Sequence, residues 1–486
     1  MTHGVPSLRQ LVHGACLTAL IASAALVLCA SAAGATTGYL YTAVGSDIER
    51  FAVGSDTTLA YKGPTPGGPT GVDYPGSLVI ARTADGMNLY QLAGSGSTQY
   101  LYQYSVASSR GALSPKSSAG PIPLSNCCES HFLAVFNPAA SGSAGQNALY
   151  VLDNNGSPGH YFPTIYVFDI NATNGAITSA GSAGVPGFYA AVSLGYSGNT
   201  LVLEGSHYVA SGTATAFQYA RINPSNGFPV FPNALSDNPC GGEFVCNDGP
   251  IFMMDEDHIL ASAEVFDPNS VPAGLYESGV EAYATGTFNS LGSTITEPRY
   301  GPHDITSNGH FYFTTESDNV YGDPDEGDAW FDEFSPDGLS EGYFLLPAGS
   351  SPGGIFSLGS GLYIANGSAG GLAYRLSPGH VPARTPLSTP LGDALTGFLV
   401  HELTVTVQGT GAGKVHGASI ACPRTCSASI PAGTHVTLTE KPSAGSRFAG
   451  WKGACSGKQP KCQTTMTSAR KVIAEFTRIR HRKTPK

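Results

Sequence analysis

The feature that most constrains the fold is a strand pattern that recurs along most of the chain. Its clearest copy lies at residues 147–181, where apolar segments alternate with turn residues such as Asn174-Gly175. Within this copy, the polar cluster Asp153-Asn154-Asn155-Gly156 is predicted to form a turn, and Thr164–Ile170 a strand. One such hairpin cannot bury both of its faces, so it needs neighbours of the same kind.

Equivalent strand positions recur at a nearly regular spacing. They lie 49 to 60 residues apart, by subtraction of the residue numbers, at Tyr41, Tyr90, Tyr150, Val202, Leu260, Tyr312 and Tyr363. This period is typical of β-propeller blades with long loops. The 62 Gly, 22 Phe and 23 Tyr also favour many short strands over helices.

The order of the apolar segments predicts how the propeller closes. Each later hairpin is preceded by an inner strand, as Ser77–Arg82 precedes the second, but the first hairpin at Tyr39–Val53 has none. One inner segment, Asp393–Val400, is left over at the far end. We therefore expect it to complete the first blade, which gives seven blades and leaves no open sheet edge.

The N-terminus has the pattern of a secretory signal. An apolar run at Ala15–Ala30 follows Arg9 and precedes small residues that end at Ala35, the expected cleavage site. The run of about 16 residues is shorter than the roughly 20 that span a bilayer, although a retained anchor is the alternative. Lipid attachment at Cys29 is disfavoured because the bulky Leu28 precedes it. We expect an exported protein.

The remaining cysteines fit an oxidising compartment. Beyond the signal there are eight, in four close pairs: Cys127/Cys128, Cys240/Cys246, Cys422/Cys426 and Cys455/Cys462. Local disulfides are the simplest pairing, but other connectivities remain open. The spacings do not match those of a zinc site.

Charge is divided unevenly along the chain. Residues 401–486 hold 14 Lys and Arg and 3 Asp and Glu, a net charge of +11. Residues 1–400 hold 10 Lys and Arg and 32 Asp and Glu, a net charge of −22, and the two charges sum to −11. A basic C-terminal module, with the basic tail Arg478–Lys486, predicts an anionic partner such as a cell-wall polymer or a lipid surface rather than nucleic acid. A merely solvated face is the alternative.

Several segments of the propeller region resemble a known family. Leu149-Tyr150-Val151, Thr164–Asp169 and Thr173–Thr178 resemble the YVTN-type repeat of lactonase-like seven-bladed propellers. Glu297–Asp304, with the following Ser307–Phe313 and Glu316, resembles that family's Gly-Pro-Arg-His blade, although His303-Asp304 stands where the family has Arg-His.

This resemblance implies a candidate catalytic cluster of Arg299, His303, Asp304 and Glu316. In a lactonase-like hydrolase, His303 or Glu316 would act as general base and Arg299 would stabilise the oxyanion. The alternative is that these residues cap blade turns in a binding protein without catalysis.

The C-terminal module resembles a divergent InlB-type bacterial repeat. The matching residues are Pro431-Ala432-Gly433-Thr434, Phe448–Trp451, the two cysteine pairs and Ala474-Glu475-Phe476. The resemblance implies a small β-rich, grasp-like fold found on bacterial surface and secreted proteins. Trp451 is expected to anchor its core, with sugar stacking as the alternative.

These observations give four predicted regions. They are a signal peptide at 1–35, a seven-bladed β-propeller at 36–400, an all-β, disulfide-stapled repeat domain at 401–477 and a disordered basic tail at 478–486. The acidic loop with Asp323, Asp325, Glu326 and Asp328 resembles part of a Ca2+ site, and a solvated loop is the alternative.

We expect a monomeric binding or adhesion module on a bacterial surface, which recognises a cell-wall polymer, a surface glycan or a protein. The lactonase-like hydrolase is kept as the alternative. Motifs of zinc proteases and nucleotide-binding loops are absent from the sequence.

Overall fold

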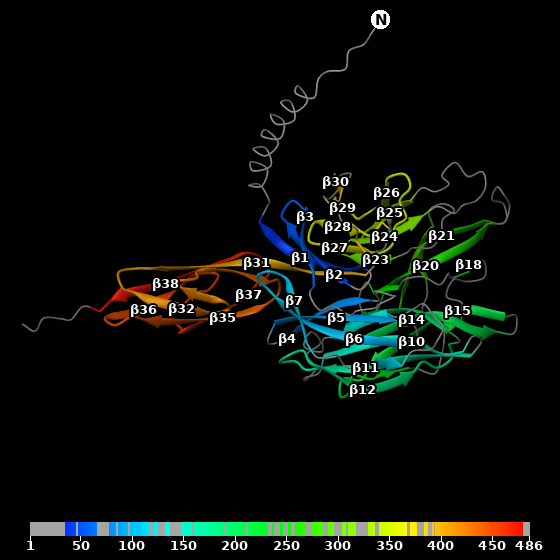
Figure 1. Ribbon diagram of the computed structural model, residues 1–486, viewed down its shortest axis with the longest axis horizontal. Coiled ribbons are helices and arrows are strands. Elements are labelled where there is room, and N and C mark those ends of the chain that lie inside the picture. Colours follow the sequence, from blue (N-terminus) through cyan, green and yellow to red (C-terminus); the bar gives the residue numbers. More distant parts are fainter. Residues whose placement is uncertain are drawn as a thin grey trace, which may run out of the picture.

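The computed structural model in Figure 1 contains two bodies joined by one long strand. It describes residues 35–479 except 45–46, 66–76, 84–85, 96–97, 117–120, 124–131, 137–146, 158–159, 189, 210–211, 232–235, 238–243, 246–250, 254–257, 268–274, 285–289, 296–303, 308–309, 317–328, 336–339, 367–369, 377–382, 387–390 and 393. In this part of the chain all regular structure is β-strand, as the composition predicts. No helix that could cross a membrane occurs among these residues.

The larger body begins with three sheets whose strands follow one another in the sequence. The first consists of β1 (Thr36–Val44), β2 (Asp47–Gly54) and β3 (Leu59–Pro64), and it is joined by β31 (Leu395–Gln408). The second consists of β4 (Leu78–Thr83), β5 (Gly86–Ser95), β6 (Thr98–Ala107), β7 (Ala112–Pro115) and β8 (Pro121–Pro123). The third consists of β9 (Phe132–Phe136), β10 (Asn147–Ser157), β11 (His160–Ile170) and β12 (Ile177–Gly184).

Four further sheets complete this body. The fourth holds β13 (Ala190–Ser197), β14 (Thr200–Val209), β15 (Gly212–Ile222), β16 (Pro229–Val230) and β17 (Ser236–Asp237). The fifth holds β18 (Phe244–Val245), β19 (Ile251–Met253), β20 (His258–Asp267), β21 (Leu275–Ala284) and β22 (Ser290–Ile295). The sixth holds β23 (Asp304–Ser307), β24 (Phe311–Glu316), β25 (Ala329–Phe334) and β26 (Ser340–Leu345). The last holds β27 (Ile355–Leu358), β28 (Gly361–Ile364), β29 (Leu372–Arg375) and β30 (Ala383–Pro386).

The innermost strands of these sheets contact one another in a closed cycle. The order of contacts is β31, β4, β9, β13, β19, β23 and β27, and β27 in turn contacts β31. The closing strand is β31, which pairs antiparallel with β1 so that Phe398 lies opposite Tyr39. The leftover segment at Asp393–Val400 thus supplies the strand that the first hairpin lacks, as its position in the sequence predicts.

The core lies between neighbouring sheets because the middle strands are buried on both faces. On β1, Leu40 packs with residues of the last sheet such as Tyr363, whereas Tyr41 packs with residues of the second sheet such as Leu89. On β10, Leu149 packs with residues of the second sheet and Tyr150 with residues of the fourth. Strands buried on both sides read as continuous apolar runs, which explains why these positions recur so clearly in the sequence.

One predicted turn is wrong. Asp153-Asn154-Asn155-Gly156 continue β10 in an extended conformation and pair with residues 164 to 161 of β11. Pairing with β11 gives this segment backbone hydrogen bonds at alternate residues, so its local turn preference is overridden. The hairpin therefore reverses only beyond Ser157.

The smaller body consists of two packed sheets that share one core. One sheet has the order β34 (Ser427–Pro431), β31, β38 (Arg470–Arg478) and β36 (Ser446–Gly453). The other has the order β33 (Ile420–Cys422), β32 (Gly413–Gly417), β35 (His435–Pro442) and β37 (Lys461–Thr465). Residues 395–399 of β31 pair within the large body and residues 400–408 within the small one, so the boundary predicted at residue 400 falls inside one strand.

Two disulfides lie in this small core or against it. Cys422 is bonded to Cys426 and Cys455 to Cys462, which are local pairs of the kind expected. Trp451 is 3% exposed, donates its indole N–H to the Gln459 carbonyl O at 2.8 Å and packs edge-on against Phe448. This burial agrees with its expected role as a core anchor. The other four cysteines, Cys127, Cys128, Cys240 and Cys246, lie outside the described residues.

Candidate functional site

The candidate catalytic residues fall only partly within the described structure. Asp304 is the first residue of β23 and pairs with Thr314, while Glu316 is the last residue of β24 and pairs with Ala329. The backbone therefore places Asp304 and Glu316 at the same end of two adjacent strands, two residues apart in register. Arg299 and His303 lie outside the described residues. The catalytic role of these four residues remains a prediction.

The predicted Ca2+ loop also lies outside the described part. Asp323, Asp325, Glu326 and Asp328 all belong to the undescribed segment 317–328. Among the residues that are described, no group of three or more His, Cys, Asp or Glu side chains could hold a metal ion.

The clearest cluster of one chemical kind lies on the smaller body. Along β32, β35 and β37, Val415, Val436 and Leu438 point into the core, so the residues alternating with them face solvent. The basic side chains on this outer surface, here called the basic face, are Lys414, His416, His435, Lys441 and Lys461. The positions between them carry Thr437, Thr439, Gln463 and Thr465.

Two of these lysines lie directly opposite each other. Lys414 on β32 pairs in register with Lys441 on β35, and the adjacent pair on the same side is His416 with Thr439. Thr439 in turn lies opposite Lys461. Like charges directly opposite on an antiparallel sheet destabilise it, so this arrangement costs folding energy unless an anion offsets it.

No acidic side chain relieves the repulsion on the basic face. Glu440, the one acidic residue of β32, β35 and β37, lies on the inner side opposite Val415, and burial raises the pKa of its carboxyl. Within the described structure, the side chains of Lys414, Lys441 and Lys461 make no hydrogen bond or ion pair. Their ammonium groups are therefore available to an external anion.

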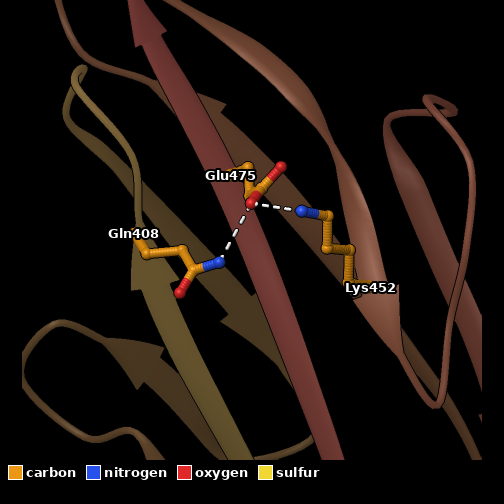
Figure 2. A network of polar contacts seen from close by, with 3 residues as sticks. All are labelled: Gln408, Lys452 and Glu475. Carbon is orange, nitrogen blue, oxygen red and sulfur yellow. Dashed lines mark hydrogen bonds and ion pairs between the residues drawn. The ribbon is translucent and has the colours of Figure 1, made fainter.

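The other sheet of the small body contains an ion pair. Figure 2 shows Glu475 between Lys452 and Gln408, with the Lys452 ammonium 2.7 Å and the Gln408 amide nitrogen 2.9 Å from the same carboxylate oxygen. The hydrogen bond from Lys452 is the main cause that lowers the pKa of Glu475. Arg447, Arg470, Lys471 and Arg478 of this sheet form no ion pair within the described residues, so unpaired positive charge lies on both sheets. The basic face differs in that two of its cations, Lys414 and Lys441, lie directly opposite each other in register.

The two bodies meet at the turn Pro431-Ala432-Gly433-Thr434, part of the bacterial-repeat motif in the sequence. Arg82, from the end of β4, donates hydrogen bonds from its guanidinium group to the Ala432 carbonyl O and the Thr434 hydroxyl. Gly433 has a φ of 77°, a left-handed conformation that favours glycine, and the Arg82 guanidinium lies beside it. Half-burial of Arg82 lowers the pKa of its guanidinium group. This contact and β31 fix the small body against the large one.

The sequence alone indicates a basic module but not the basic face. The alternation of Lys414 and His416 around Val415, and of Lys441 beside Glu440, is the signal that could have located it. Nothing in the sequence near Arg82 indicates its contact with residues 432–434, because the two segments are about 350 positions apart.

Solved structures of similar shape share little sequence with this chain. A protein from Lactobacillus plantarum is 11% identical, with a TM-score of 0.44, over 74% of this chain and 99% of that one. Apo AztD from Citrobacter koseri is 9% identical, with a TM-score of 0.38, over 74% and 98%. Sqt1 from Saccharomyces cerevisiae is 11% identical, with a TM-score of 0.39, over 81% and 92%. At TM-scores below 0.5, these similarities identify neither a fold nor a function.

The C-terminal part of the chain gives a more specific match. Among curated proteins, no relative is found. Residues 403–480, however, match the family described as the divergent InlB B-repeat domain, which covers the small body from β31 to β38. The chain therefore carries a divergent InlB B-repeat domain at its C-terminal end.

Proposed function

We propose that this protein is a secreted or cell-surface adhesion module, in which a seven-bladed β-propeller is held on an anionic polymer of the cell envelope by its basic repeat domain. The polymer is of the phosphate- or carboxylate-bearing kind. The propeller acts as a monomer and presents its loops to a surface glycan or protein.

The basic face is the observation that carries this proposal. Three lysines without counter-ions share one exposed sheet surface, and Lys414 lies directly opposite Lys441. A polymer with regularly spaced negative charges offsets this repulsion at several points at once. On the opposite sheet Glu475 neutralises Lys452, and no two cations lie directly opposite each other in register.

The architecture supports the propeller part of the proposal. The innermost strands touch in a closed cycle, and β31 pairs with β1 to join the two ends of the chain's larger body. Each of its described sheets contains one of the recurring strand positions of the sequence, which supports the proposed seven blades. The grasp-like class of the repeat domain and the export signal at residues 1–35 are parts of the same proposal. Export is consistent with the disulfides of the repeat domain.

Co-sedimentation with cell-wall particles that carry a glycerol phosphate polymer tests the proposal. The full chain should pellet at low salt and be released at about 0.5 M salt, because screening weakens exposed charge contacts. The variant Lys414→Gln/Lys441→Gln/Lys461→Gln should bind about tenfold more weakly.

Lys452→Gln on the opposite sheet is the matched control and should bind like the parent chain. Equal binding by the triple variant, or an equal loss in Lys452→Gln, would overturn the assignment of the basic face. Removal of residues 480–486 in a further variant separates the contribution of the basic tail.

A second candidate, the lactonase-like hydrolase, is favoured by the backbone positions of Asp304 and Glu316 at one end of paired strands. In that case His303 or Glu316 acts as general base and Arg299 stabilises the oxyanion. If the full chain hydrolyses a lactone and both Glu316→Gln and His303→Ala lose this activity, the protein is a hydrolase and not an adhesion module without catalysis.

A further inference from the structure

A cavity of about 220 Å3 lies at the joint between the two bodies. The propeller side contributes Arg82, Met87 and Ser108, and the repeat domain contributes Ser419, Ile430 and Thr434. With Thr83, Ala418 and Pro431 also in the lining, the wall combines a cation with hydroxyl groups and apolar side chains. Its volume is below the roughly 300 Å3 at which pockets for drug-sized molecules begin, so it suits a ligand of monosaccharide size.

Arg82 gives this cavity its charge. Its guanidinium group is half-buried and donates to Thr434 and Ala432, both neutral acceptors. Within the described residues, no carboxylate lies within ion-pair distance of Arg82. An arginine has five N–H donors in a planar fork, so donors remain for a further acceptor. A partly desolvated cation without a counter-ion attracts a carboxylate more strongly than an exposed one does.

The repeat-domain wall is built by a turn with an unusual backbone. Ala418 and Ser419, which join β32 to β33, have φ values of 48° and 65°, a region that residues other than glycine rarely occupy. This turn brings Ala418 and Ser419 into the lining of the cavity. Hydroxyl groups and an arginine in the same lining match the hydroxyl and carboxylate groups of a sugar acid.

We propose that the cavity at the joint binds a small polyhydroxylated carboxylate of the uronic acid class, with the carboxylate on Arg82 and sugar hydroxyls on Ser108 and Ser419. The apolar face of the sugar ring packs against Met87 and Ile430. This site is separate from the basic face and does not depend on the adhesion proposal.

Ligand-observed NMR titration of the full chain tests this site, with D-glucuronate as probe and D-glucose as its neutral analogue. Glucuronate should bind saturably, and glucose about tenfold more weakly, because it lacks the charged acceptor. Ser108→Phe fills the cavity but keeps Arg82, so it should abolish saturable binding.

Two controls separate this result from general effects of charge or folding. Ser109→Phe places the same ring on the exposed neighbouring residue and should leave binding unchanged. Lys414→Gln/Lys441→Gln/Lys461→Gln should also bind glucuronate like the parent chain. Equal binding of glucose and glucuronate, undiminished binding by Ser108→Phe, or loss in the triple lysine variant would each overturn the proposal.

Discussion

The hydroxyl group of Tyr363 lies 3.2 Å from the carbonyl oxygen of Thr57, a residue 306 positions earlier in the chain. Tyr363 is on β28 of the last sheet, and Thr57 is in the β2–β3 turn of the first, so this hydrogen bond joins the two sheets at which the cycle closes. The same contact joins consecutive sheets elsewhere: Tyr41 donates to Gly111 O, Tyr90 to Gly175 O and Tyr150 to Gly227 O, at 2.6 to 2.8 Å.

These acceptors occupy equivalent turns with a left-handed backbone. Gly111, Gly175 and Gly227 have φ values of 61°, 69° and 73°, and Thr57 takes the same conformation at 68°. The left-handed residue turns its carbonyl toward the preceding sheet, where the buried tyrosine reaches it. The recurring tyrosines thus link each of these sheets to the next one by a hydrogen bond.

Replacing one of these tyrosines tests how much its hydrogen bond contributes to stability. Tyr363→Phe keeps the buried ring but leaves the Thr57 carbonyl without this donor, so it should lower the free energy of unfolding by about 1–2 kcal/mol. Urea unfolding followed by circular dichroism measures the loss. In Tyr61→Phe, the lost hydrogen bond to Glu49 is exposed and water replaces it, so stability should be nearly unchanged. An equal loss in both variants would contradict the role of the buried bond.

Burial of the tyrosines predicts a loss of stability in alkali. Burial raises the pKa of Tyr104 to about 12 and raises the pKa values of Tyr41 and Tyr363 as well. Between pH 10 and 12 the unfolded chain loses phenol protons that the folded chain retains, so the free energy of unfolding should fall as pH rises through this range. Below about pH 9 these groups are protonated in both states and should give no dependence.

Urea midpoints between pH 9 and 11.5 test this expectation. Tyr104→Phe should flatten the decline, because it removes one of the groups that titrate differently in the two states. If the urea midpoint of Tyr104→Phe declines with pH as steeply as that of the parent chain, groups other than Tyr104 cause the alkaline loss of stability.

The contact at the closing strand is tight enough to exclude a side chain. A Cβ atom at Gly397 of β31 would lie 2.6 Å from the Tyr39 carbonyl O and 3.1 Å from the Leu358 side chain. Gly397→Val should therefore disrupt the pairing of β1 with β31 and cost about 2 kcal/mol or more. Gly184→Ala, where a Cβ atom would meet open space, is the control for thermal unfolding. A Gly397→Val chain with the parent unfolding temperature would contradict this packing.

The Cys455–Cys462 disulfide should stabilise the repeat domain. Both cysteines are part of its core, and their bond closes the loop that also carries the Gln459 carbonyl bonded to Trp451. Cys455→Ser/Cys462→Ser should lower the free energy of unfolding of this domain by about 2 kcal/mol. Trp451 fluorescence in urea measures the change. The parent chain under reducing conditions should be destabilised at least as much, because reduction also opens Cys422–Cys426.

The sequence predicts the blades better than it predicts what joins them. The equivalence of Tyr41, Tyr90 and Tyr150 follows from spacing, but their acceptors are 70 to 85 positions away and become visible only when the sheets are placed side by side. The turn assigned to Asp153–Gly156 failed because local composition does not contain the partner strand β11.

The candidate sites divide in the same way. Net charge identifies a basic module, yet only the register of β32 with β35 places Lys414 opposite Lys441. The joint cavity depends on a contact between Arg82 and Thr434, which no local pattern encodes. Asp304 and Glu316 lie on the strands that the sequence indicates, while Arg299 and His303 lie outside the described residues.

The continuity of β31 has a mechanical consequence. A tether that pulls on the repeat domain transmits its load along this strand, without a hinge, into the pairing with β1. The hydrogen bonds of that pairing run across the direction of pull, so they must yield together in shear rather than open one at a time. Anchorage under flow would therefore load the seam that closes the propeller, together with the contact of Arg82 with residues 432–434.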